Sequence, residues 1–285
     1  MFNDLVRQRK MVMHHTRLIN AASRVTVRIC LLLIVFSCSD SHGAEPPLRL
    51  RVLTWNIHHG LGVDGKLDLA RIANGILECR PDLVALQEVD QLATRSNSTD
   101  QPAELARLTG LQMAFGDNIP LQGGRYGNVI LSRFPITTVR NHLLPNHRNG
   151  EQRGVLQASI AVTSQDRPIL FLATHLDHRP NDSERIASAA FINGLVESAQ
   201  TPALLAGDLN AVPDSAVLQR LNEAWKPAQQ QPSLPTVPVD HPTRQIDYVL
   251  TGIRNDWKQV SAEVLPEALA SDHRALLVTI EMAAP

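Results

Sequence analysis

Residues 203–213 read ALLAGDLNAVP, an apolar run that ends at a glycine and continues into two polar residues, Asp208 and Asn210. An apolar run beside a glycine is typical of a buried strand, here residues 203–206. Side chains two residues apart on an extended chain point to the same side, so we expect Asp208 and Asn210 to lie together where the strand ends. The alternative is a helix N-cap, because Asn and Asp favour caps and a helical run follows Pro213.

The same pattern recurs along the chain, where apolar runs lead into Asn56, Glu88 and His175. Periodicity and breaker residues predict further strands at 50–55, 82–87, 128–132, 155–162, 169–174, 246–250 and 275–280, and helices at 67–78, 102–108, 183–198 and 214–221. Strands alternate with helices early and follow one another in the middle, which predicts an α/β layered domain with mixed sheets. Layered α/β enzymes build their sites from polar groups at strand ends.

The composition is that of a folded globular chain. The sequence has 285 residues, of which 44% are hydrophobic and 19% charged, and this excludes a disordered, collagen-like or low-complexity protein. No long linker follows Leu48, so we expect one domain over residues 48–282. The three cysteines, Cys30, Cys38 and Cys79, cannot build a disulfide framework or a CxxC zinc site.

The first 44 residues are typical of an export signal. Residues 29–36 read ICLLLIVF, follow a basic segment and are too short to span a bilayer comfortably. We therefore expect residues 1–44 to direct export to the periplasm or outside the cell. Cys38 ends a lipobox-like sequence, which leaves a lipoprotein with an anchor at Cys38 open. The alternatives are an uncleaved membrane anchor or a buried strand.

Charge is unevenly distributed along the chain. Residues 1–44 carry six Lys or Arg and two Asp or Glu, which leaves 21 basic and 26 acidic residues in the remainder and a net charge there of about −5. Proteins that bind duplex DNA usually gain affinity from a basic surface. The aromatic content of 4% also offers few side chains for base stacking. Charge and composition therefore disfavour a nucleic-acid substrate without excluding one.

The chemistry of two groups of polar residues indicates possible roles for them. Glu88 offers carboxylate oxygens, which suit a hard cation, and Asn56 can add an amide oxygen; a solvated strand-end charge and a turn residue are the alternatives. Asp247 lies in the apolar segment IDYVL, and a buried Asp needs a partner. A histidine ring nitrogen is a good partner, since a carboxylate positions an imidazole and raises its pKa, and the chain offers one such ring at His273, directly after Asp272.

Seven segments carry a family resemblance. They are TWNIHHG (54–60), LQEVD (86–90), YGNVILSRFPI (126–136), THLDH (174–178), GDLNAVP (207–213), QIDYVL (245–250) and SDHR (271–274). Together they resemble the endonuclease/exonuclease/phosphatase superfamily, which includes DNase I-like nucleases, abasic-site endonucleases, neutral sphingomyelinases and inositol polyphosphate 5-phosphatases. Each motif alone is weak, but all seven follow the family's order from about residue 51 to 280. The resemblance implies a four-layered α/β/β/α sandwich with two packed mixed β-sheets.

The resemblance also assigns roles at a metal site. Glu88, Asn56 and Asp272 would lie at or near a divalent cation, Mg²⁺ or Mn²⁺. Asp208 would activate the attacking water, and Asn210 would bind the phosphate.

The remaining roles concern the phosphate and its surroundings. His175 would contact the scissile phosphate, and Asp247 would orient His273, which stabilises the transition state. Asn128 and Arg153 are the candidates for substrate contact, with a mainly structural role as the alternative for Asn128 and pairing with a carboxylate as the equal alternative for Arg153.

One position departs from the family pattern. Nuclease members often have an acidic residue two after the Asn, where this chain has His58, followed by His59. This weakens assignment as an abasic-site endonuclease. Whether His58 and His59 contribute to the site stays open, and so does a transition metal.

These observations predict an exported, divalent-metal-dependent phosphoesterase that uses in-line attack by water. The expected substrate is a phosphodiester or phosphomonoester in a small molecule or a phospholipid head group. The alternatives are an extracellular nuclease and a non-catalytic phosphate-binding relative. No stable protein partner is implied.

Overall fold

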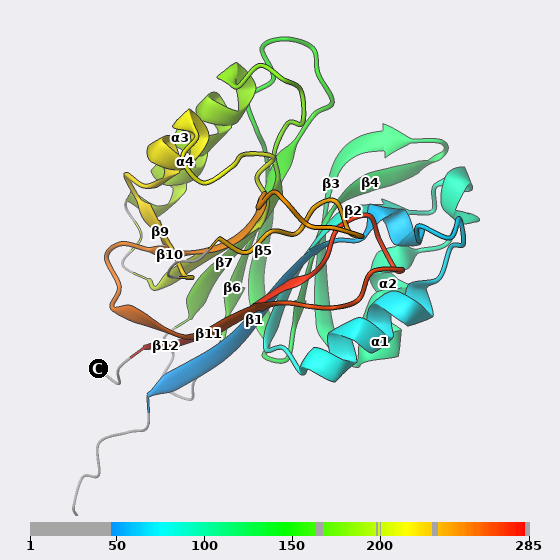
Figure 1. Cartoon of the computed structure of the whole chain (residues 1–285), viewed down its shortest axis with the longest axis horizontal. Coiled ribbons are helices and arrows are strands. Elements are labelled where there is room, and N and C mark those ends of the chain that lie inside the picture. The colour runs from blue at the N-terminus through cyan, green and yellow to red at the C-terminus, as the bar shows by residue number, and fades with distance from the viewer. Residues whose placement is uncertain (1–46, 163–167, 198, 200, 230–232, 283–285) are drawn as a thin grey trace, which may run out of the picture. The chain divides into compact units, whose positions relative to one another are not determined.

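The structure is a computed structural model that describes residues 47–162, 168–197, 199, 201–229 and 233–282 (Figure 1). The predicted export signal at 1–44 and the lipid anchor at Cys38 lie outside the described residues and stay predictions. In chain order the elements are β1 (Leu48–Asn56), η1 (His58–Gly60), α1 (Leu69–Cys79), β2 (Leu83–Gln91), η2 (Thr94–Ser96), α2 (Gln101–Thr109), β3 (Gln112–Leu121), β4 (Gly124–Ser132), β5 (Ile136–Leu143), β6 (Gly154–Ile160), β7 (Ile169–His175), α3 (Ser183–Glu197), β8 (Ala203–Asp208), α4 (Ala216–Leu221), β9 (Trp225–Pro227), β10 (Asp247–Gly252), β11 (Trp257–Val264) and β12 (Leu276–Met282).

The strands form two six-stranded mixed sheets, ordered β11-β12-β1-β2-β4-β3 and β5-β6-β7-β8-β10-β9. Each sheet has one parallel pair at its centre, β1 with β2 and β7 with β8, and the other neighbours are antiparallel. Helix α1 connects the first parallel pair and α3 connects the second. Because the two strands of a parallel pair end at the same edge, each sheet brings two strand ends together at its centre.

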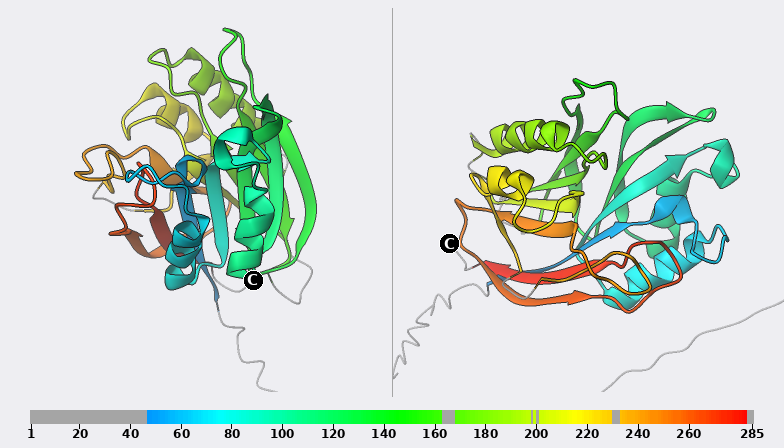
Figure 2. Two further views of the ribbon diagram at one scale, coloured as in Figure 1. Left: turned by 90° about the vertical axis from the view of Figure 1, so that its right-hand side faces the viewer. Right: turned by 45° about the horizontal axis from the view of Figure 1, so that its top comes forward.

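Three apolar layers hold the sheets and helices together. The inner faces of the sheets pack on each other through residues such as Val52, Phe171 and Val249. The outer face of the first sheet, including Trp55, packs on α1 and α2, and that of the second packs on α3 and α4. Figures 1 and 2 show the two helix pairs on opposite outer faces with the sheets between them. The predicted four-layered α/β/β/α sandwich is confirmed.

Strand alternation explains which polar side chains reach the space between the sheets. In β8 Ala206 belongs to the inter-sheet core and Leu205 to the outer face. Two-residue alternation therefore turns Asp208 inward. The same alternation turns Asn56 and His175 inward at the ends of β1 and β7, and it turns Asp247 inward at the start of β10, two residues before the inward-facing Val249. The polar residues at this edge thus continue the rows of the apolar core.

Glu88 needs a separate explanation, because alternation along β2 does not direct it inward. Leu83 and Ala85 are inward and Val84 and Leu86 outward, so residue 88 of a regular strand would face outward. The pairing of β2 with β4 shifts its register between Leu86 and Val89. Glu88 itself has φ +60, in the left-handed region. A bulge of this kind re-aims one side chain, and here it turns Glu88 toward Asn56.

Two helices begin two residues later than predicted, because a capping residue precedes each of them. The helix expected at 67–78 starts at Leu69 because Asp68 is its N-cap, accepting from Arg71 N at 2.9 Å. The helix expected at 214–221 likewise starts at Ala216, after the N-cap Ser215. Four strands were not predicted, β3, β5, β9 and β11, and these are the four edge strands of the two sheets.

Two further features concern the described residues only. Cys79 is a buried free thiol. None of the described helices has both the length and the apolar character that crossing a bilayer requires.

Candidate active site

The candidate site lies where the two parallel pairs end, and a hydrogen-bonded amide links the two sheets there. The Nδ2 atom of Asn56 donates to Oε1 of Glu88 at 3.0 Å and to Oδ2 of Asp208 at 3.2 Å. The backbone N–H of His58 donates to Oδ1 of Asn56 at 3.1 Å, which fixes the orientation of the amide. Asn56 thus holds two carboxylates from different sheets side by side with its N–H groups.

Three site residues form one row across the second sheet. Asp208 pairs in register with His175 on β7 and with Asp247 on β10. The close approach of the strands depends on Gly207, where an added Cβ would lie 2.0 Å from the carbonyl oxygen of Thr174. The sheet register, rather than loop folding, therefore positions these groups.

His273 is held by a buried carboxylate. Its Nδ1 lies 2.9 Å from Oδ2 of Asp247, which also accepts from the hydroxyl of Thr236 at 2.5 Å. Burial alone would lower the pKa of His273, but the Asp247 carboxylate opposes this and raises the pKa to about 10. The imidazole is therefore protonated at neutral pH. Its Nε2 atom lies 3.8 Å from Oδ2 of Asp208, and the N–H there can donate to an anion.

The buried surroundings of His175 keep its ring neutral. Its Nδ1 lies 3.2 Å from Nη1 of Arg153 and its Nε2 lies 3.1 Å from Nδ2 of Asn210. Both neighbours are donors, and a protonated ring could accept from neither. Burial and then the Arg153 charge hold the pKa of His175 well below its usual value.

Asp208 is the carboxylate that all these groups surround. It is 1% exposed, and its Oδ1 accepts from the backbone N–H of Asn210 at 2.9 Å. Burial, followed by the charge of Asp247, raises the pKa of Asp208 to about 7. A carboxylate with such a pKa can take up a proton near neutral pH. The alternative in which Asp208 and Asn210 cap a helix is wrong, because Ser215 caps α4.

Among the described residues, two groups have potential ligand atoms within 4.8 Å of one another: His58, His59 and Glu88, and Asp208, Asp247 and His273. The second group is already tied internally by the ion pair of His273 and Asp247. Glu88 makes no ion pair within the described part of the chain and is open to a divalent cation. Carboxylate and imidazole donors of this kind fit a divalent ion.

Asp272, predicted to lie near the metal, belongs to neither group. Its side chain is exposed, and its Oδ1 accepts from the Ser271 hydroxyl at 3.3 Å. The same hydroxyl donates to the backbone oxygen of Asn56 at 2.7 Å. Ser271 was missed as a site residue, although it belongs to the quoted motif SDHR.

The two predicted substrate contacts are engaged within the protein. Asn128 is 1% exposed, and its Nδ2 donates to the carbonyl of Gly154 at 3.0 Å, which joins the two sheets. Arg153 is buried and pairs with Glu151 at 2.7 Å. Its guanidinium also contacts His175, so Arg153 holds a site histidine. Of the two roles considered for Arg153, this geometry favours internal pairing.

Thr236 was also missed, and its sequence context offers no signal for it. Its hydroxyl reaches Asp247 from a segment without a chemical motif, so only the folded chain brings the two together.

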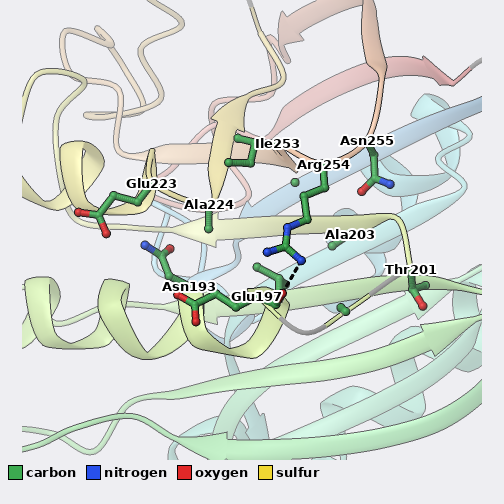
Figure 3. A pocket seen from close by; sticks show the side chains of 12 residues that line it. Asn193, Glu197, Thr201, Ala203, Glu223, Ala224, Ile253, Arg254 and Asn255 are labelled. Carbon is green, nitrogen blue, oxygen red and sulfur yellow. Dashed lines mark hydrogen bonds between the residues drawn. The ribbon is translucent and has the colours of Figure 1, made fainter.

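A separate cavity lies far along β8 from the candidate site. It measures about 80 Å³ and is bordered by Ala203, the first residue of the strand whose last residue is Asp208. Figure 3 shows Arg254 across this cavity, where its guanidinium donates to the carbonyl of Glu197. None of the candidate catalytic residues lines it. This cavity is therefore not part of the site.

Comparison with known proteins agrees with the resemblance of the seven segments. A model of the Endonuclease/Exonuclease/phosphatase family matches residues 53–273. Uncharacterized protein YbhP of Escherichia coli strain K12 is 27% identical over 254 residues, which are 81% of this chain and 96% of that protein.

Solved structures share the fold. An endonuclease/exonuclease/phosphatase from Beutenbergia cavernae has a TM-score of 0.73 and 27% identity, with 83% of this chain and 72% of that chain covered. A mannosyl-6-phosphatase from Bacteroides thetaiotaomicron has a TM-score of 0.67 and 16% identity, with 81% of this chain and 99% of that chain covered. The second likeness shows the fold alone.

Proposed function

Because this chain belongs to the endonuclease/exonuclease/phosphatase family, whose members hydrolyse phosphoester bonds, we propose that it is a divalent-metal-dependent hydrolase of a small phosphoester or a phospholipid head group. The observation that carries the proposal is the position of Asp208, within 4 Å of the side chains of Asn56, His175 and His273. Such a cluster can deprotonate a nucleophile and stabilise the resulting negative charge.

Asp208 supplies the base. Its raised pKa suits it to accept the proton of a water molecule as the water oxygen attacks phosphorus. The P–O bond to the leaving group then breaks, and the leaving oxygen takes a proton from solvent. Asn56 donates to Oδ2 of Asp208 and so keeps one carboxylate oxygen oriented throughout.

His273 and Asn210 supply donors to the phosphoryl oxygens. The His273 imidazolium places a positive charge beside Asp208, where charge accumulates during attack. Asn210 has φ +46, a conformation that Asn tolerates, and its amide lies against His175. These donors are fixed before the substrate arrives, so little reorganisation is needed.

Glu88 is the proposed primary ligand of the cation, Mg²⁺ or Mn²⁺. A bound divalent cation would neutralise a phosphate oxygen and reduce its repulsion of the nucleophile. Asn56 positions Glu88 through the 3.0 Å hydrogen bond.

The net negative charge of the chain supports a small phosphoester over a nucleic acid as the substrate. Outside residues 1–44 the chain carries an acidic excess, which disfavours a polyanionic duplex. An extracellular nuclease is the second candidate, because the family includes nucleases. Hydrolysis of plasmid DNA that exceeds hydrolysis of small phosphoesters and sphingomyelin would favour that candidate.

The test is an activity screen on sphingomyelin, inositol phosphates, a chromogenic phosphodiester and plasmid DNA, with Mg²⁺ or Mn²⁺ and with EDTA. We expect EDTA to abolish hydrolysis, and we expect Asp208→Asn and His273→Ala to lower turnover by about 10²-fold or more. Asp240→Asn is the control, because that side chain is 76% exposed and forms an ion pair with the exposed His241, away from the candidate site residues. Normal turnover in a folded Asp208→Asn variant would refute the proposal.

Export through residues 1–44 is part of the proposal, with Cys38 as a candidate lipid anchor. Its support is the basic and apolar sequence at the start of the chain. Cell fractionation and the mass of the mature N-terminus test it; a cytoplasmic protein that keeps residues 1–44 would contradict it.

A further inference from the structure

Two adjacent histidines accompany Glu88 at the edge of the first sheet. His58 and His59 lie in the short turn η1, one residue after β1 ends at Asn56. A ring nitrogen of each histidine and a carboxylate oxygen of Glu88 lie within 4.8 Å of one another. Ligands of one tetrahedral ion, each about 2.0–2.2 Å from it, are separated by roughly 3–4 Å, so small side-chain rotations bring all three to one ion.

The ring of His58 is in the tautomer that a metal ligand needs. Its Nδ1 lies 3.2 Å from the carbonyl oxygen of Leu61. A carbonyl only accepts, so Nδ1 carries the hydrogen and Nε2 keeps its lone pair. Metal-bound histidines almost always donate their other ring N–H to a carbonyl or carboxylate in this way.

His59 supplies the independent observation. His59 is only 9% exposed. The Nδ1 atom of its ring has no hydrogen-bond partner within the described part of the chain. A buried polar atom without a partner costs free energy, and a bound cation would remove that cost. Gln101 donates to the carbonyl oxygen of His59 at 2.6 Å, so the turn that presents this ring is anchored to α2.

The backbone keeps both rings in place at a conformational cost. His58 and His59 each have φ +45, in the left-handed region that residues other than glycine seldom adopt. The two rings meet edge to face, with centroids 4.6 Å apart. The turn therefore presents two imidazoles on the side of Glu88.

We propose that His58 and His59 join Glu88 as ligands, and that the metal site therefore binds a first-row transition ion such as Mn²⁺, Co²⁺ or Zn²⁺ in preference to Mg²⁺. Imidazole nitrogen suits these ions, whereas Mg²⁺ prefers oxygen ligands and retains its waters. The inference rests on the proposed function for its biological role, but metal binding can be measured without any turnover.

The test is pulsed EPR of the purified full-length protein loaded with Mn²⁺, together with Mn²⁺ titration in the presence of Mg²⁺. We expect ¹⁴N coupling from imidazole, and we expect Mg²⁺ to displace Mn²⁺ only in large excess. His58→Asn and His59→Asn are the test variants, since Asn tolerates the left-handed backbone of this turn. Each should weaken Mn²⁺ binding about tenfold or more and reduce the ¹⁴N signal.

His241→Asn is the matched control, an imidazole that is 89% exposed and outside both ligand groups. It should leave the coupling and the Mn²⁺ affinity unchanged. An Mn²⁺ spectrum without ¹⁴N coupling, or equal affinities for Mn²⁺ and Mg²⁺, overturns the inference. Glu88→Gln separates it from the proposed function: if that variant loses metal and activity while both histidine variants bind Mn²⁺ normally, the hydrolase proposal stands and the histidine ligation is wrong.

Discussion

The Nδ1 atom of His273 lies 2.9 Å from Oδ2 of Asp247, and the carboxylate of this pair is completely buried. The other carboxylate oxygen, Oδ1, has no hydrogen-bond partner within the described part of the chain. Within the described residues, the side chain of Asp247 thus interacts through Oδ2 with His273 and Thr236. This single contact keeps an imidazolium beside Asp208.

Asp247→Asn is expected to lower turnover and to move the pH profile. Because the Asp247 carboxylate raises the pKa of His273 to about 10, the wild-type protein keeps the imidazolium until the pH approaches that value. Without the carboxylate, the alkaline decline of kcat/KM should begin at a lower pH. Turnover at neutral pH should fall by about 10²-fold.

The measurement is the pH dependence of kcat/KM, with the His273 ring titrated by NMR. Asp240→Asn is the matched control, because it removes the carboxylate from an exposed His–Asp pair 3.7 Å apart. If kcat/KM declines over the same alkaline pH range in Asp247→Asn and in the wild type, Asp247 does not set the pKa of His273.

Asp208→Asn is expected to stabilise the metal-free protein near neutral pH while it lowers turnover. The folded pKa of Asp208 is raised from 3.8 to about 7, chiefly by burial. The folded state therefore binds this proton more tightly, so the contribution of Asp208 to stability is present below pH 3.8 and is lost as the pH rises through about 7. The variant does not titrate and avoids this loss.

Urea unfolding in EDTA between pH 4 and pH 8 measures the effect. The unfolding free energy of Asp208→Asn relative to wild type should increase across this range and then level off. A difference that stays constant with pH would mean that Asp208 has an ordinary pKa in the folded protein.

Much of the site follows from alternation within apolar strands. The runs that precede Asn56, His175 and Asp208 are buried on both faces, and such central strands have a strong hydrophobic signal. Counting by two from the inter-sheet core then places these residues on the inner face. The family motifs supplied the same residues independently.

The edge strands could not be predicted, for a physical reason. Strand β3 reads QMAFGDNIPL and contains Gly, Asp, Asn and Pro, which are poor strand formers. It pairs with β4 on one side only, and its side chains alternate between buried and partly exposed. Pairing with a neighbour, rather than local preference, makes such a segment a strand.

The sequence pattern also could not predict the direction in which the side chain of Glu88 points. Alternation along β2 directs it outward, and only the bulge opposite β4 reverses this. Nothing in LQEVD signals a left-handed residue, so the sequence identified Glu88 as a candidate metal ligand but could not predict the direction of its side chain.

Arg153→Lys is expected to lower kcat about 10-fold or more and to leave KM nearly unchanged. The guanidinium contacts His175 at 3.2 Å and His178 at 3.2 Å, and an ammonium group cannot span both rings. Displacement of a site histidine affects the chemical step more than substrate binding.

Steady-state kinetics of Arg153→Lys distinguish the two roles considered for this residue. A direct phosphate contact would instead raise KM. Arg220→Lys is the control, because Arg220 is a partly exposed partner of Glu223. An increase in KM with an unchanged kcat would contradict the positioning role and restore substrate binding.

Cys79 is expected to resist thiol reagents in the folded protein. The side chain is buried at the end of α1, and its thiol donates to the carbonyl oxygen of Gly75 at 3.0 Å. Burial, reinforced by the charge of Glu263, raises the pKa of the thiol to about 11. Because only the thiolate reacts, alkylation at pH 8 should be slow, and its rate should increase as the pH approaches the raised pKa.

A Cys30→Ser/Cys38→Ser variant isolates the Cys79 thiol for iodoacetamide labelling followed by mass spectrometry, with the urea-unfolded chain as the fast-reacting control. Equal labelling rates for the folded and unfolded chains at pH 8 would show that Cys79 is accessible and reactive, in contradiction to its place in the core.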